Sequence, residues 1–97
     1  MTTKEIAYLR SLGQTLQPSV RIGKMGLTDE VKESAEAALM ANELIKVRTL
    51  NKTSPVEPKE AMSALAEKLG AVLVQTIGHN GLLYRKNKKK PKIIFPS

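Results

Sequence analysis

The sequence contains no cysteine and no tryptophan, and only 3% of its 97 residues are aromatic. Without cysteine, neither disulfide bonds nor thiolate metal sites can form. The one histidine, His79, argues against a histidine-based metal cluster. So few aromatic rings also argue against a sheet on which RNA bases stack. We therefore expect no metal and no cofactor, and any nucleic acid should be recognised by its backbone and shape.

Long apolar segments are also missing. No apolar run approaches the roughly 20 residues of a membrane span, and Met1-Thr2-Thr3-Lys4-Glu5 lacks the apolar core of a signal peptide. The length fits one domain with a modest core. We expect a soluble, monomeric, cytoplasmic protein that does not associate with membranes.

Acidic residues are absent from the last third of the chain. Residues 1–67 carry nine basic and nine acidic residues, which cancel, so residues 68–97 carry the whole net charge of +7. The basic residues of that segment are Lys68, Arg85, Lys86, Lys88, Lys89, Lys90 and Lys92. Such a run can be a solvated tail or can bind a polyanion. An anionic membrane surface is a further possibility, but no amphipathic helix accompanies the run.

Gly23-Lys24-Met25-Gly26 lies between an expected strand and an expected helix that begins near Thr28. Glycines let a backbone approach a phosphate closely, and the start of a helix offers unpaired N–H donors and partial positive charge. Lys24 adds a full charge, and Met25 can pack against a base, a sugar or its own loop. The pattern predicts a clamp for the phosphate backbone, although the same residues also occur in ordinary strand-to-helix turns.

Two other phosphate-binding loops are excluded. A Walker A loop needs a glycine five positions before Gly23, where Pro18 stands, and a serine or threonine after the lysine, where Met25 stands. The dinucleotide fingerprint needs a third glycine, and none follows at the right spacing.

The apolar periodicity and the turn residues predict alternating helices and strands. We expect helices from Thr2 or Thr3 to Gly13, from Thr28 onward and over 58–69, and strands over 19–22, 43–50, 72–77 and 82–85. Residues 51–58 should form a loop. Asn80-Gly81 is a strong hairpin signal between the last two strands. The order α-β-α-β-α-β-β indicates an α/β fold with a mixed four-stranded sheet whose last strand is antiparallel.

Basic side chains alternate with apolar ones on two of these strands. Arg21, Lys46 and Arg48 should therefore share a polar sheet face. These three residues and Arg85 are candidate phosphate contacts. His79 lies at a turn, where it can stack on a base or simply be exposed. Tyr84 is more easily explained as core packing. Catalysis is not expected, because His79 has no evident serine or acid partner, and we expect no small-molecule substrate.

Several segments together resemble the CRM domain (chloroplast RNA splicing and ribosome maturation), in its stand-alone bacterial YhbY-type form. They are Val20-Arg-Ile-Gly-Lys-Met-Gly-Leu-Thr28, Glu43-Leu-Ile-Lys-Val47, Val74-Gln-Thr-Ile-Gly78 and Leu82-Leu-Tyr-Arg85. The resemblance covers roughly residues 3–86. It implies a fold similar to the C-terminal domain of translation initiation factor 3 and a G-x-x-G loop that contacts RNA. It also implies binding to ribosomal RNA in precursors of the large subunit.

The lysine-rich end departs from that family core. We expect a CRM-type domain over residues 1–86 and a basic tail over 87–97. The predicted RNA contacts are Arg21, Gly23, Lys24, Met25, Gly26, Lys46, Arg48, Arg85, Lys86, Lys88, Lys89 and Lys90. The alternative function is a protein-interaction adaptor that docks through Ile93-Ile94-Phe95 and has incidental affinity for RNA. That apolar trio can also pack back on the domain or add an edge strand.

Overall fold

The computed structural model describes residues 1–23, 26–50, 58–89 and 91–95. Its elements are α1 (Thr3–Gly13), β1 (Pro18–Ile22), α2 (Asp29–Asn42), β2 (Leu44–Thr49), α3 (Pro58–Leu69), β3 (Val72–Ile77) and β4 (Asn80–Tyr84). The predicted order α-β-α-β-α-β-β is confirmed. Most of the predicted loop over 51–58 lies outside the described residues. No helix within the described ranges is long and apolar enough to cross a membrane.

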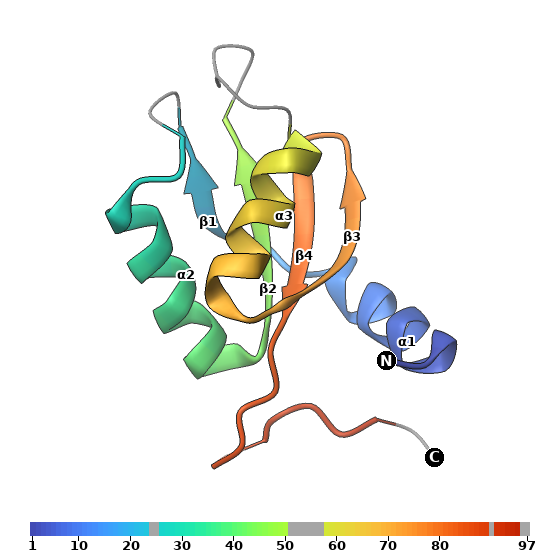
Figure 1. Cartoon of the computed structure of the whole chain (residues 1–97). Helices are drawn as coiled ribbons and strands as arrows, with labels where there is room; N and C mark the ends of the chain where they lie inside the picture. Colours follow the sequence, from blue (N-terminus) through green and yellow to red (C-terminus); the bar gives the residue numbers. More distant parts are fainter. Residues whose placement is uncertain (24–25, 51–57, 90, 96–97) are drawn as a thin grey trace.

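The four strands form one mixed sheet in the order β1-β2-β4-β3. β1 and β2 are parallel, and α2 connects them. β4 is antiparallel to both of its neighbours, β2 and β3. The last strand of the chain therefore fills the centre of the sheet, as Figure 1 shows. The predicted mixed sheet with an antiparallel last strand is confirmed.

Helices α2 and α3 cover one face of this sheet, and α1 covers part of the other (Figure 1). On the first face the main core combines Ala35 and Leu39 of α2, Met62 and Leu65 of α3, and strand residues such as Ile45. On the second face a smaller cluster gathers around one residue of α1. Its buried members are Leu9, Leu44, Val74, Leu82 and Tyr84. Because α1 spans only part of the second face, the rest is left without a helix over it.

Local sequence signals explain the helix boundaries. Thr2 caps α1 and forms a capping box with Glu5, in which each side chain accepts a hydrogen bond from the other residue's backbone N–H. Thr28 caps α2 by accepting a hydrogen bond from the N–H of Val31 at 3.2 Å. Gly70 follows α3 with a φ of 65°, a left-handed conformation that glycine adopts without strain. These signals fix the helix starts and ends at or near their predicted positions.

The predicted turn of the last hairpin is wrong by two residues. Ile77 pairs with Asn80, so the two turn residues are Gly78 and His79, and Asn80-Gly81 lies within β4. Gly78 has a φ of 56°, and a two-residue turn of the II′ type has glycine in this first position. A Cβ on Gly81 would lie 2.9 Å from Met62, so this glycine allows α3 to pack closely on β4. Packing rather than turn geometry therefore accounts for Gly81.

Candidate nucleic-acid interface

The predicted clamp lies at the C-terminal end of β1. The N–H of Gly26 donates a hydrogen bond of 3.0 Å to the carbonyl of Gly23. Gly26 has a φ of 75°, which favours glycine. A Cβ on Gly23 would meet no atom within 4 Å, so packing inside the protein does not require this glycine. Lys24 and Met25 lie outside the described residues.

The start of α2 contributes less positive charge than its sequence position suggests. Asp29 and Glu30 occupy its first turn, and both are exposed. Their carboxylates compensate the positive end of the helix dipole. An approaching phosphate would therefore depend mainly on the backbone of residues 23–26 and on basic side chains nearby.

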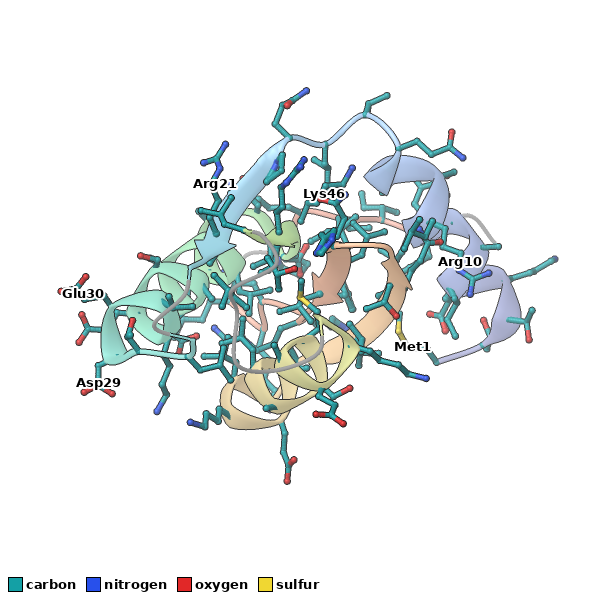
Figure 2. All side chains as sticks on the ribbon, turned by 90° about the horizontal axis from the view of Figure 1, so that it is seen from above. Met1, Arg10, Arg21, Asp29, Glu30 and Lys46 are labelled. Carbon is teal, nitrogen blue, oxygen red and sulfur yellow. The ribbon has the colours of Figure 1, made fainter. Side chains whose placement is uncertain are left out.

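Such side chains lie on the sheet face that α1 leaves open. Arg21 of β1 and Arg48 of β2 are partners in the parallel register, and both are exposed. Lys46, two residues before Arg48, is half-buried. Figure 2 shows Arg21 and Lys46 on the side of the sheet that faces away from α2 and α3. We call Arg21, Lys46 and Arg48 the basic strip.

The basic strip continues into the Gly23–Gly26 turn, because Arg21 precedes Gly23 by two residues on the same chain. Among the described residues the one ion pair joins Glu36 and Arg85, so no carboxylate neutralises the strip. Parallel pairing keeps Arg21 and Arg48 side by side despite their like charge. Repulsion between them makes a polyanion a favourable partner.

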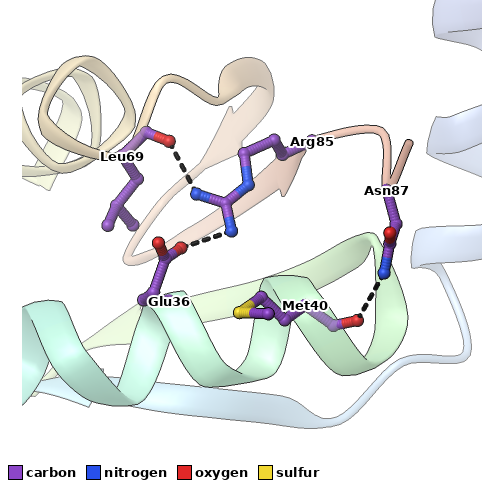
Figure 3. Close-up of polar contacts among 5 residues, drawn as sticks. All are labelled: Glu36, Met40, Leu69, Arg85 and Asn87. Atoms are coloured by element: carbon purple, nitrogen blue, oxygen red, sulfur yellow. Dashed lines mark hydrogen bonds and ion pairs between the residues drawn. The ribbon is translucent and has the colours of Figure 1, made fainter. Parts of the chain in front are cut away.

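Arg85 is held differently from the strip (Figure 3). Its guanidinium pairs with Glu36 of α2 and donates a hydrogen bond of 2.9 Å to the carbonyl of Leu69, at the end of α3. These contacts tie β4 to both helices of the main core. Arg85 stays a predicted RNA contact, but it would have to share or give up these partners to bind a phosphate.

Beyond β4, the tail is fastened to the domain by Glu43. This residue lies between α2 and β2, is 0% exposed and has a φ of 64°. One carboxylate oxygen accepts a hydrogen bond of 2.6 Å from the N–H of Asn87, and the other accepts from the N–H groups of Lys92 and Ile93. Burial raises the pKa of the Glu43 carboxyl, but these three donors outweigh it, so the pKa lies below its usual 4.5.

Lys88 and Lys89 lie between these anchoring points, and Lys86 lies just before the first of them. All three lysines are exposed. The side chain of Asn87 also donates a hydrogen bond of 3.1 Å to the carbonyl of Met40, near the end of α2 (Figure 3). Lys90 lies outside the described residues. Glu43 and Asn87 therefore give the start of the basic tail a defined path beside α2.

The apolar end of the tail packs back on the domain. Ile93 and Phe95 join the cluster around Leu9, whereas Ile94 is 83% exposed. Phe95 makes edge-to-face contacts with Tyr8 and Tyr84, with ring centroids 5.9 and 5.8 Å apart. Tyr84 is thus a packing residue, and burial raises the pKa of its hydroxyl.

The remaining candidate, His79, is exposed at the β3–β4 turn. Its ring Nδ1 lies 3.1 Å from the hydroxyl of buried Thr49, and its carbonyl accepts a hydrogen bond of 2.8 Å from the N–H of Thr49. These contacts give His79 a structural role at the end of β2. The described ranges contain no cluster of three or more histidine or acidic residues that could hold a metal ion.

Sequence reasoning missed one feature of the open face, a cavity of about 180 Å³ beside Lys46. Three of the residues that line it carry side-chain amides: Gln14 at the end of α1, Gln75 of β3 and Asn80 of β4. None of the three stands out in the sequence, because each belongs to a different element.

An α/β sheet with an open basic face beside Gly23 and Gly26 is suited to a polyanionic ligand. Comparison with known proteins identifies the family: residues 1–85 match the CRS1 / YhbY (CRM) domain, and the chain belongs to this family. The resemblance inferred from the sequence is therefore confirmed. The match ends just before the predicted boundary at residue 86, and the division into domain and tail stays a prediction.

Individual relatives cover nearly the whole chain. "Probable RNA-binding protein YqeI" of Bacillus subtilis is 34% identical over 96 residues, which are 99% of each chain. A protein of Haemophilus influenzae named "RNA-binding protein" is 37% identical over 97 residues, covering 99% of this chain and 95% of its own. The solution structure of the hypothetical protein SAV1595 from Staphylococcus aureus is 35% identical, with a TM-score of 0.78 over 99% of both chains.

Proposed function

We propose that this protein binds RNA without catalysing a reaction on it, and that the Gly23–Gly26 turn and the basic strip grip the phosphate backbone. The observation that carries the proposal is the continuity of the two: Arg21 and Arg48 lie side by side on an open sheet face, directly before the turn. The printed names of two relatives, both of which call the protein RNA-binding, support the same ligand.

The RNA we propose is ribosomal RNA in precursors of the large ribosomal subunit, and this part rests on the family. Lys86, Lys88, Lys89 and Lys90 would add charge beside α2, and Lys24 and Met25 would contact the RNA from the turn. Ile93 and Phe95 are partly buried in the protein's own cluster, so the adaptor function has less exposed apolar surface to use.

The turn is tested by Gly23→Asp. A side chain at this position meets no protein atom within 4 Å, so the fold should survive while the new carboxylate repels phosphate. We expect affinity for RNA to fall at least about tenfold, since a charged contact is worth ~1.5–3 kcal/mol and every 1.4 kcal/mol is tenfold. Fluorescence anisotropy with a single-stranded RNA measures this.

The matched control is Ser63→Asp, which adds the same charge at an exposed position of α3, on the opposite face of the sheet from the basic strip. A folded Gly23→Asp protein that binds RNA as tightly as the control would disprove the clamp. The proposed RNA itself is tested by crosslinking in cells, where crosslinks outside large-subunit precursors would refute the ribosomal assignment.

A further inference from the structure

Two local features border the cavity on the open sheet face. Gly13, near the end of α1, lies so close to β4 that a Cβ there would be 2.4 Å from Leu82. β3 has an irregular register between Leu73 and Gln75. A bulge of this kind can re-aim a side chain: Val74 packs in the cluster around Leu9, and the next residue, Gln75, also lines the cavity on this face.

The cavity contains an unsatisfied hydrogen-bond acceptor. Asn80 lines it, and Oδ1 of Asn80 is buried without a hydrogen-bond partner in the part of the chain that the structure describes. Buried polar atoms in proteins almost always have a partner. A ligand that donates a hydrogen bond would supply the missing one.

The size of the cavity limits that ligand. Its volume is about 180 Å³, whereas pockets for drug-sized ligands span about 300–1,000 Å³. An engineered cavity of about 150 Å³ in another protein holds one benzene molecule. The space therefore suits a single six-membered ring.

The lining defines the chemistry of the ring. Gln14, Gln75 and Asn80 each offer an amide that both donates and accepts hydrogen bonds. Pyrimidine bases carry a matching edge, with N3–H between two carbonyls in uracil and an amino group beside N3 in cytosine. Lys46 is also one of the residues that line the cavity. Its ammonium group can pair with a phosphate next to such a base.

We propose that this cavity binds one unstacked pyrimidine base of an RNA strand whose backbone follows the basic strip to the Gly23–Gly26 turn. This inference rests on the proposed RNA binding and adds a base preference to it. Two residues along β2 separate Lys46 from Arg48, a Cα distance of about 6–7 Å. One strand can thus place a base in the cavity and neighbouring phosphates on the strip.

The test compares uridine, cytidine and adenosine homopolymers of about eight nucleotides, a length within the usual range of single-strand sites. Affinities are measured by anisotropy at one salt concentration. We expect both pyrimidine polymers to bind at least fivefold more tightly than the adenosine polymer, since one bidentate contact discriminates by ~1–3 kcal/mol. Equal affinities would overturn the base site and leave the RNA function standing. Failure of all three to bind would overturn both.

Variants then assign any preference to the cavity. Gln75→Leu and Asn80→Ala each remove one lining amide, and we expect the preference to fall below twofold with affinity for adenosine unchanged. Gln17→Ala removes an exposed glutamine outside the cavity and should keep the preference. Thermal unfolding checks that each variant is folded. If both cavity variants fold and keep the full preference, the base is read elsewhere and the proposal is wrong.

Discussion

Replacing Glu43 by glutamine should detach the basic tail from the domain. The substitution keeps the size of the side chain, removes its charge and replaces one acceptor oxygen by an N–H₂ donor. In the wild type both oxygens accept backbone N–H groups, from Asn87 on one side and from Lys92 and Ile93 on the other. Glu43→Gln therefore weakens all three hydrogen bonds. In at least one of them the new N–H₂ group faces a backbone N–H group, so that no hydrogen bond can form there.

The loss of stability in Glu43→Gln can be estimated from those three hydrogen bonds. Hydrogen bonds to a charged group contribute about 1.5–3 kcal/mol and neutral ones about 0.5–1.5 kcal/mol, so three bonds lose about 3 kcal/mol together. A domain of this size is stable by about 5–15 kcal/mol, so the variant still folds. With a urea dependence of ~1.5 kcal/mol per M, the unfolding midpoint should fall by roughly 2 M.

The pH dependence provides a second readout. Because the pKa of Glu43 is lower in the folded protein than its usual 4.5, the carboxylate stabilises the fold above pH 4.5. This stabilisation is lost as the pH falls through the folded pKa. We therefore expect the stability difference between wild type and Glu43→Gln to be full at pH 7 and to shrink below pH 4.5.

Urea unfolding at several pH values measures both effects, and amide hydrogen exchange locates them at the backbone N–H groups of Asn87, Lys92 and Ile93. Glu33→Gln is the control, because Glu33 is an exposed glutamate of α2 and its loss changes the net charge equally. If Glu43→Gln unfolds at the same urea concentration as this control, and those three amides stay protected, the carboxylate does not anchor the tail.

Two further experiments test the packing on the second sheet face. Gly13→Ala should destabilise the protein by about 1–3 kcal/mol, because its methyl group would collide with Leu82; unchanged thermal stability would show that α1 can move away freely. A double-mutant cycle between Phe95→Leu and Tyr8→Leu should give a coupling energy of about 0.5–1.5 kcal/mol from their edge-to-face contact. A coupling energy near zero would contradict the docked position of the tail.

The order of the elements and the shared polar face of two strands were predictable from the sequence. Ile22, Ile45 and Val47 alternate with Arg21, Lys46 and Arg48, and the common face follows from that alternation. The parallel pairing was predicted from the helix that connects the two strands. Local patterns of this kind are readable because neighbouring residues along one strand determine them.

What the sequence could not show depends on distant partners. Glu43 was predicted to begin a strand, but β2 begins at Leu44, and the hydrogen-bond donors that hold Glu43 lie 44 to 50 residues away. The cavity amides were missed for the same reason, and also because Gln75 lines the cavity beside an irregularity in β3 that no local pattern predicts. The hairpin was misplaced because Asn80-Gly81 has a turn-like sequence, whereas Gly81 serves close packing against Met62.

The central position of β4 has a consequence for synthesis of the chain. β3 pairs only with β4 in the sheet, and β2 needs β4 on one of its edges. In a nascent chain that ends before Asn80, the edges of β2 and β3 that β4 covers are therefore open, and the core is incomplete. The four-stranded sheet can therefore be completed only after residues 80–84 have left the ribosome, and until then these open edges expose the chain to aggregation.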